Sequence, residues 1–153
     1  MTRIFSLLVF CPLLTVAADD RNIESLETIS DLGELCEFYT PNGTALQLTS
    51  GPQAYRAGLC MGFVKGNVES WLRTKYKDCG TTPGVSLGPV FAAIRKTYRL
   101  ASLRDPDQES GWFSRSASNL LDEAVFDEWD KKLDGSDCPL FIDDQLTSTA
   151  DND

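Results

Sequence analysis

Two pairs of neighbouring carboxylates are the side chains whose type and spacing could best support catalysis. Asp122-Glu123 and Asp127-Glu128 lie at helical spacings of four and five, and paired acids can act as general acid and base. They alternate with apolar residues, however, which favours the solvent-facing side of an amphipathic helix. The chain has no histidine, which excludes serine and cysteine hydrolase triads and histidine-ligated zinc. We therefore expect a protein that is not an enzyme, with no catalytic residues and no cofactor.

The first eighteen residues have the layout of a secretory signal peptide. Arg3 precedes an apolar run over residues 4–16, which Pro12 interrupts and which Ala17 and Ala18 follow. Such a run of about 13 residues is shorter than the roughly 20 that a membrane-spanning helix needs. A transmembrane anchor is the alternative. We expect residues 1–18 to be removed and the mature chain to be exported without inserting into a membrane.

Four cysteines remain after that cleavage: Cys36, Cys60, Cys79 and Cys138. An even number of cysteines in an exported chain indicates two disulfides, and the sequence leaves three pairings open. A metal site is the alternative, but no two cysteines have Cys-x-x-Cys spacing and no histidine could complete a ligand set. We expect four disulfide-bonded cysteines and no bound metal.

The charge of the chain is acidic, and much of the excess lies at the C-terminus. The chain has 14 Lys+Arg, 23 Asp+Glu and a net charge of −9, which argues against nucleic acid as a partner. Residues 134–153 include six aspartates and no basic residue. We expect a helical domain over residues 19–138 and an acidic, disordered tail over residues 139–153. The apolar residues Leu140, Phe141 and Ile142 indicate that the start of this tail is held against the domain.

Apolar residues recur with helical periodicity through most of the mature chain. The pattern predicts four main helices, at about residues 23–39, 53–76, 87–103 and 112–133. Ser86 is placed to cap the third of them. No alternation typical of strands is present, so we expect an all-α fold, a single domain of four main helices stapled by disulfides.

Three glycines share one side of the second expected helix. Gly58, Gly62 and Gly66 lie four residues apart, so they form a stripe without side chains. Three glycines cost roughly 3 kcal/mol of helix propensity relative to alanine. The interpretation that we favour is close packing of another helix on this stripe, and a binding groove is the alternative.

Several short motifs in the middle of the chain resemble those of a known family. Residues 60–66 read Cys-Met-Gly-Phe-Val-Lys-Gly, Cys79 follows, and residues 83–86 read Pro-Gly-Val-Ser at the start of a helix. Residues 31–36, Asp-Leu-Gly-Glu-Leu-Cys, and the amphipathic segment 116–126 lie on either side. In order and spacing these motifs resemble the Rap/Tai family of periplasmic immunity proteins against type VI secretion amidases.

The resemblance implies a function in self-protection. Proteins of this family bind a peptidoglycan amidase that sister cells inject, and they block its active-site groove, often as homodimers. On this basis we expect a periplasmic location, a cognate amidase effector as the partner, and a homodimer. Inhibition of this kind needs complementary shape and charge rather than catalysis.

The residues that would contact the effector are expected in the acidic loop between the third and fourth helices. This loop contains Asp105, Asp107, Gln108 and Glu109, and Trp112 follows it as a candidate aromatic anchor. The alternative is a solvated connection between helices, with Trp112 buried in the core.

Basic residues on the third helix could form a second contact or could pair with acids of the fourth helix: Arg95, Lys96 and Arg99. The strongest rival function is a secreted carrier of small apolar molecules. Its pocket would be lined by aromatic residues from three helices: Phe63, Phe91, Tyr98 and Trp129. A chaperone for exposed apolar chains is a third interpretation.

Overall fold

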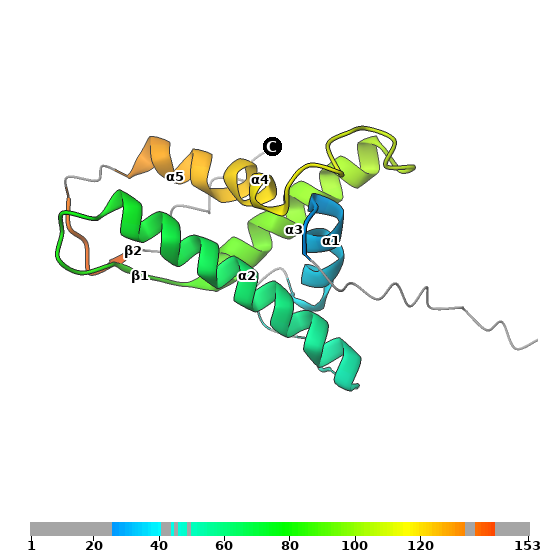
Figure 1. Ribbon diagram of the computed structural model, residues 1–153, viewed down its shortest axis with the longest axis horizontal. Coiled ribbons are helices and arrows are strands. Elements are labelled where there is room, and N and C mark those ends of the chain that lie inside the picture. Colours follow the sequence, from blue (N-terminus) through cyan, green and yellow to red (C-terminus); the bar gives the residue numbers. More distant parts are fainter. Residues whose placement is uncertain (1–25, 41–43, 45, 49, 134–136, 143–153) are drawn as a thin grey trace, which may run out of the picture.

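The computed structural model describes residues 26–40, 44, 46–48, 50–133 and 137–142, and these residues are mostly helical. Along the chain the helices are α1 (Ile29–Leu35), the 3-10 turn η1 (Cys36–Phe38), α2 (Gly51–Lys75), α3 (Leu87–Arg104), α4 (Ala117–Leu121), the π-helical turn η2 (Asp122–Phe126) and α5 (Asp127–Lys132). The last three follow one another without a break, so the described residues form four main helices and the expected all-α fold is confirmed. Figure 1 shows these helices, and α1 lies against α2, α3 and α4.

The first helix begins later than the apolar pattern predicts, at Ile29 instead of about residue 23. A capping box sets this start: the Thr28 hydroxyl accepts a hydrogen bond from the Asp31 amide at 3.2 Å, and the Asp31 carboxylate accepts one from the Thr28 amide at 2.9 Å. Ile29, Leu32 and Leu35 then turn inward and are fully buried. The expected signal peptide, residues 1–18, lies outside the described residues.

The second helix matches its prediction closely. Ser50 caps it by accepting a hydrogen bond from the Gln53 amide, and Pro52 occupies the first turn, where no amide hydrogen is needed. One side of the helix enters the core through residues spaced three and four apart: Ala57, Cys60, Val64, Val68 and Leu72.

The glycine stripe of α2 is exposed, and no other helix of the described residues packs on it. Gly58, Gly62 and Gly66 are exposed, and a Cβ atom added to any of them would meet no atom of the described residues within 4 Å. The buried residues of α2 occupy one side of the helix, and the three glycines lie on the opposite, outer side.

The last helix also begins later than expected, at Ala117 instead of Trp112. Residues 112–116 form a turn that is tied to the chain before α1: the Ile29 amide donates to Arg115 O at 2.9 Å, and the Ala117 amide donates to Glu27 O at 2.9 Å. The third helix runs as predicted. Ser86 is its N-cap residue, although its side chain makes no capping hydrogen bond.

Two disulfides are present, as expected, and their pairing is Cys36–Cys60 and Cys79–Cys138. The first joins η1 to α2, and both of its residues are fully buried. The second joins the loop after α2 to the C-terminal segment.

A small parallel sheet, which the sequence pattern did not predict, forms beside the second disulfide. In it β1 (Gly84–Val85) pairs with β2 (Phe141–Ile142), and Ile142 is only 4% exposed. Residues 141 and 142 therefore pack against the rest of the protein, as the sequence indicated for the start of the tail. The remainder of the expected tail, residues 143–153, lies outside the described residues.

Aromatic rings fill the core instead of lining a common cavity. Phe91 stacks on Tyr39 with ring centroids 4.1 Å apart, and Trp129 meets the ring of Trp71 edge-on at 5.6 Å. The pocket expected for a carrier is therefore not formed as predicted, because Phe91 and Trp129 are buried and already in contact with other rings.

In the part of the chain that is described, no helix has both the length and the apolar character of a membrane span.

Candidate protein-binding surface

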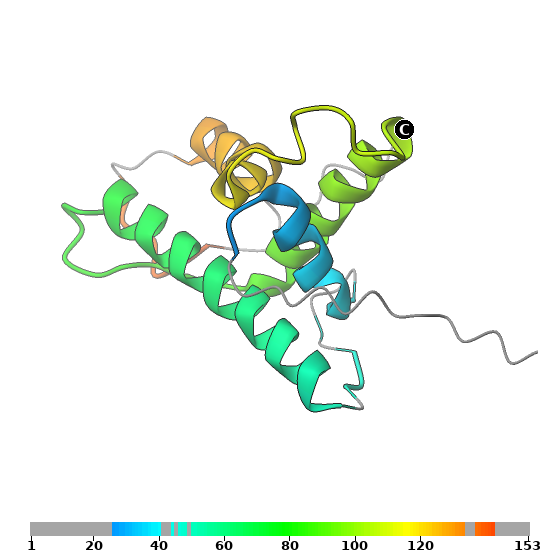
Figure 2. The same cartoon turned by 45° about the vertical axis from the view of Figure 1, so that its right-hand side comes forward.

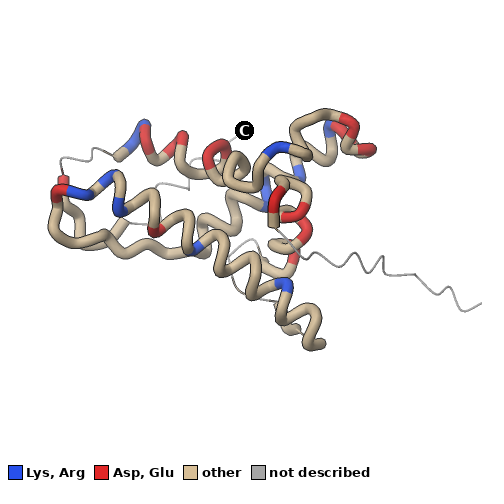
Figure 3. Tube along the Cα trace, viewed as in Figure 1, with Lys and Arg blue, Asp and Glu red and all other residues tan. Residues whose placement is uncertain are grey.

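The acidic loop between α3 and α4 projects from the body of the protein. We call residues 105–112 the tip loop. Figures 1 and 2 show that α3 reaches beyond its neighbours and that the loop turns back from its far end. Acidic residues gather at this end in Figure 3. The acidic residues Asp107 and Glu109 of this loop are exposed, as the sequence predicts.

Asp105 gives the tip loop its shape. Its carboxylate accepts hydrogen bonds from the Ser110 amide at 2.7 Å and from the Glu109 amide at 3.3 Å. Hydrogen bonds from Ser110, first from its side chain and then from its backbone, lower the pKa of Asp105, because they favour the charged form. Asp105 is thus a structural anion at the base of the loop, and its oxygens are turned inward to the backbone.

Gln108 fastens the other side of the tip loop to α1. Its side-chain oxygen accepts a hydrogen bond from the Ser30 hydroxyl at 3.0 Å. The residue has a positive φ of 55°, which turns the chain at this point. Asp107 and Glu109, on either side of it, are exposed. The loop therefore presents two outward carboxylates on a backbone held at both ends.

Trp112 is half-buried, between the two alternatives that the sequence left open. Its indole N–H donates to the Glu123 carboxylate at 2.8 Å, and its ring meets Phe113 edge-on with centroids 4.9 Å apart. Arg115 also pairs with Glu123, at 2.6 Å. A cavity of about 440 Å³ opens beside the Trp112 ring, between the tip loop and the end of α3. Trp112 therefore supports the loop and leaves part of its ring accessible.

The carboxylates of the last helix act largely in ion pairs and hydrogen bonds. Asp130 pairs with Lys75 of α2 at 2.9 Å, and Glu128 pairs with Lys132. Burial raises the pKa of Asp122, and the neighbouring charges of Asp127 and Glu123 add to this shift. Glu123, interpreted from the sequence as part of a solvated surface, instead holds Trp112 and Arg115.

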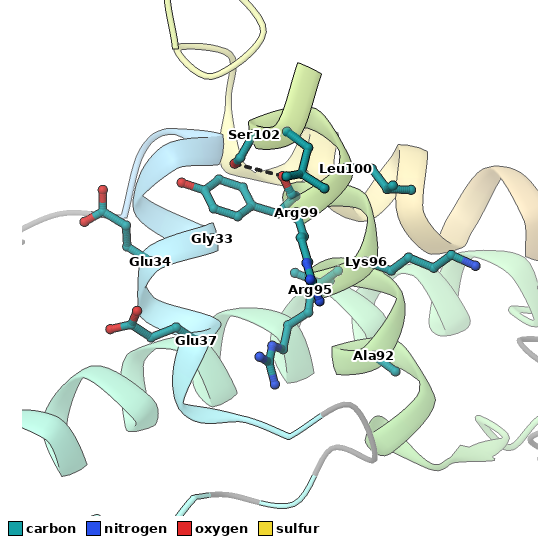
Figure 4. A pocket seen from close by; sticks show the side chains of 12 residues that line it. Gly33, Glu34, Glu37, Ala92, Arg95, Lys96, Arg99, Leu100 and Ser102 are labelled. Carbon is teal, nitrogen blue, oxygen red and sulfur yellow. Dashed lines mark hydrogen bonds between the residues drawn. The ribbon is translucent and has the colours of Figure 1, made fainter. Parts of the chain in front are cut away.

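A second concave region lies between α1 and α3, and we call it the α1–α3 groove. It encloses about 700 Å³. The two helices approach closely where the ring of Tyr98 covers Gly33, and a Cβ atom on Gly33 would lie 2.2 Å from that ring. Figure 4 shows Gly33 at this approach, together with the charged side chains of both walls. In the sequence, the only sign of this close approach of α3 is Gly33 itself, a glycine within the short helix α1.

The basic residues of α3 line this groove. Arg95 donates a hydrogen bond to the Tyr39 backbone oxygen, which draws its side chain toward the end of η1. Lys96 and Arg99 also contribute to the wall of the groove. The sequence identified these cations but did not predict that α1 would stand opposite them.

The comparisons with known proteins found no match, either to a family model, to a curated protein or to a solved structure.

Proposed function

We propose that the protein is a periplasmic immunity protein that binds a cognate peptidoglycan amidase of type VI secretion and inhibits it by occluding its active site. The observation that carries the proposal is the tip loop, a projecting acidic element whose backbone is fixed from both sides. The resemblance to the Rap/Tai immunity proteins supplies the class of partner.

The residues that carry this resemblance have structural roles that support the proposal. Cys60 of the motif over residues 60–66 forms the buried disulfide with Cys36. Gly84, in the Pro-Gly-Val-Ser segment, lies under Phe141, and a Cβ atom there would be 2.8 Å from that ring. The motif residues thus build a scaffold, and the loop that would determine specificity lies outside them.

Occlusion in this proposal depends on a preformed loop that enters the groove of the effector. Because the tip loop is already ordered, binding costs less conformational entropy than the folding of a free loop would. Asp107 and Glu109 are the exposed charges that would meet basic residues at the rim of the effector's groove. Asp105 acts indirectly, by holding the loop.

A homodimer is part of the proposal. The exposed glycine stripe of α2 supports it, since Gly58, Gly62 and Gly66 leave room for the backbone of a second helix. Tyr55, on the same helix, is 63% exposed and adds apolar surface nearby. Sedimentation of the mature chain over a range of concentrations tests this part, and a monomer at every concentration contradicts it.

The test of the proposal is calorimetric titration of residues 19–153 against the cognate peptidoglycan amidase that the proposal requires. We expect nanomolar binding, one effector per protomer, together with loss of peptidoglycan cleavage. Asp107→Lys should slow association at low salt, because it reverses a steering charge on the tip loop. Asp78→Lys is the matched control, since Asp78 is also exposed but lies in the loop after α2.

Two results would contradict the proposal. The first is an absence of binding to the effector. The second is inhibition with equal association rates for Asp107→Lys and Asp78→Lys, which removes the tip loop from the interface.

A further inference from the structure

The α1–α3 groove combines an apolar surface with a basic wall. Its apolar part is formed by Gly33, Ala92, Ile94, Tyr98, Leu100 and Leu103. Two of these residues are unusually exposed for leucine, Leu100 at 45% and Leu103 at 67%. The groove thus leaves apolar side chains in water at the end of α3, and covering them would be favourable.

Two arginines face the same groove from successive turns of α3. Arg95 and Arg99 are four residues apart, so their like charges repel each other. Arg99 makes no ion pair with any residue that the structure describes. An anion placed between the two guanidinium groups would relieve this repulsion and could accept hydrogen bonds from both.

The acids on the opposite wall do not neutralise these arginines. Glu34 of α1 and Glu37 of η1 also line the groove, and neither forms an ion pair with Arg95 or Arg99 among the described residues. Glu34 is placed instead near Arg56 of α2, with a nitrogen–oxygen distance of 4.0 Å. The groove is thus lined by three basic and two acidic side chains, and its basic residues all lie on α3.

We propose that the α1–α3 groove binds a long-chain carboxylate, with its head group between Arg95 and Arg99 and its alkyl chain on Tyr98, Leu100 and Leu103. A purely apolar ligand would leave Arg99 without an ion pair, and a small anion would leave the leucines exposed. An amphiphile with one chain satisfies both. The volume of about 700 Å³ lies within the range of roughly 300–1,000 Å³ that is usual for small-molecule sites.

This site is separate from the tip loop and does not depend on the proposed inhibition of an amidase. Binding can be measured on residues 19–153 with 11-(dansylamino)undecanoic acid, a carboxylate whose fluorescence rises in an apolar site. We expect saturable binding of one probe per chain. Palmitate should displace the probe, whereas hexadecanol and hexadecyltrimethylammonium should not, because neither carries a negative charge.

Arg99→Glu should weaken binding of the probe about tenfold or more, because hydrogen bonds between charged groups are worth at least that factor. Arg99→Gln should weaken it less, and it provides a second variant if the charge reversal disturbs the fold. Leu103→Asp should also weaken binding. Lys77→Glu is the control, since it reverses an exposed charge just after α2, outside the residues that line the groove.

The proposal is overturned if the probe binds only at micellar concentrations, if the cationic amphiphile displaces it as well as palmitate does, or if Arg99→Glu and Arg99→Gln both behave like Lys77→Glu. If Arg99→Glu weakens binding of the effector while the carboxylate probe does not bind, the groove is a protein contact. That result refutes the carboxylate site and leaves the proposed function standing.

Discussion

Glycines and a disulfide occur in two regions of this protein with opposite surroundings. At the α1 junction, Gly33 is covered by Tyr98 and the Cys36–Cys60 disulfide is fully buried. At the periphery, the glycines of α2 face open space and the Cys79–Cys138 disulfide includes an exposed residue. The difference teaches that the role of a glycine or a disulfide follows from what surrounds it and cannot be assigned from the residue type alone.

The two disulfides can be compared by how much each stabilises the fold. Loop length and burial, the two effects that decide this, rank them in opposite order. Their residues are separated by 24 positions for Cys36–Cys60 and 59 for Cys79–Cys138. In the chain-entropy description the longer loop should stabilise more, by about 0.8 kcal/mol. Burial favours the shorter loop, because its sulfurs are part of the packed core. We expect burial to outweigh loop length here.

The largest expected effect is therefore that of removing the buried disulfide. The double substitution Cys36→Ala and Cys60→Ala should lower the free energy of unfolding by about 4 kcal/mol, since it loses the cross-link and leaves unfilled space between η1 and α2. Urea denaturation under oxidising conditions measures this change. A smaller loss than that caused by removing Cys79–Cys138 would show that loop length dominates and would break the comparison.

Gly33→Ala should have the next largest effect. Its new methyl group would occupy the position of the Tyr98 ring, 2.2 Å from the nearest carbon, so the ring or α1 must move at a cost of about 1–3 kcal/mol. Adding Tyr98→Leu should recover part of the loss, because the smaller side chain makes room. If the losses of the two single variants simply add in the double variant, the alanine methyl group and the Tyr98 ring do not clash.

Removing the exposed disulfide should have a smaller and more local effect. Cys79→Ser with Cys138→Ser should cost about 2 kcal/mol, the lower end of the usual range for a disulfide, since its loss releases β2 while the packing between the helices stays intact. Hydrogen exchange offers a site-specific measurement, because the Gly84 amide is bonded to Leu140 O at 3.0 Å. This amide should exchange faster in the variant, while amides in the middle of α2 should keep their protection.

Apolar periodicity predicts the interiors of the long helices but places the starts of the first and last helices too early. Periodicity and end signals within α2 and α3 are local, and both helices lie almost where they are expected. The start of α1 has a local signal that periodicity does not use, the capping box of Thr28 and Asp31. The start of α4 depends instead on distant pairing, because Ala117 donates to Glu27 O and Ile29 to Arg115 O. Such pairing leaves no local signal, and the two-residue strands are too short to show alternation.

The candidate site shows the same division between composition and geometry. The acidic character of the tip loop was visible in Asp105, Asp107 and Glu109. Their different roles were not, because the inward orientation of Asp105 depends on how the loop folds. The bond from Ser30 to Gln108 spans 78 positions, and the groove exists only because α1 packs beside α3. Sequence thus supplied the charges of both surfaces, and tertiary contacts decided which of them face outward.

The smallest expected effect has the opposite sign and tests the peripheral region directly. Gly62→Ala should raise the free energy of unfolding of the monomer by about 0.5–1 kcal/mol, because alanine favours a helix and its methyl group meets no atom within 4 Å in the described part of the chain. Thermal unfolding at low and high protein concentration measures both this gain and any contribution from a dimer. A gain at low concentration that turns into a loss at high concentration would show that a second chain covers the stripe. The contrast with Gly33 would then hold for the monomer alone, since in the dimer both glycines would lie in close contact.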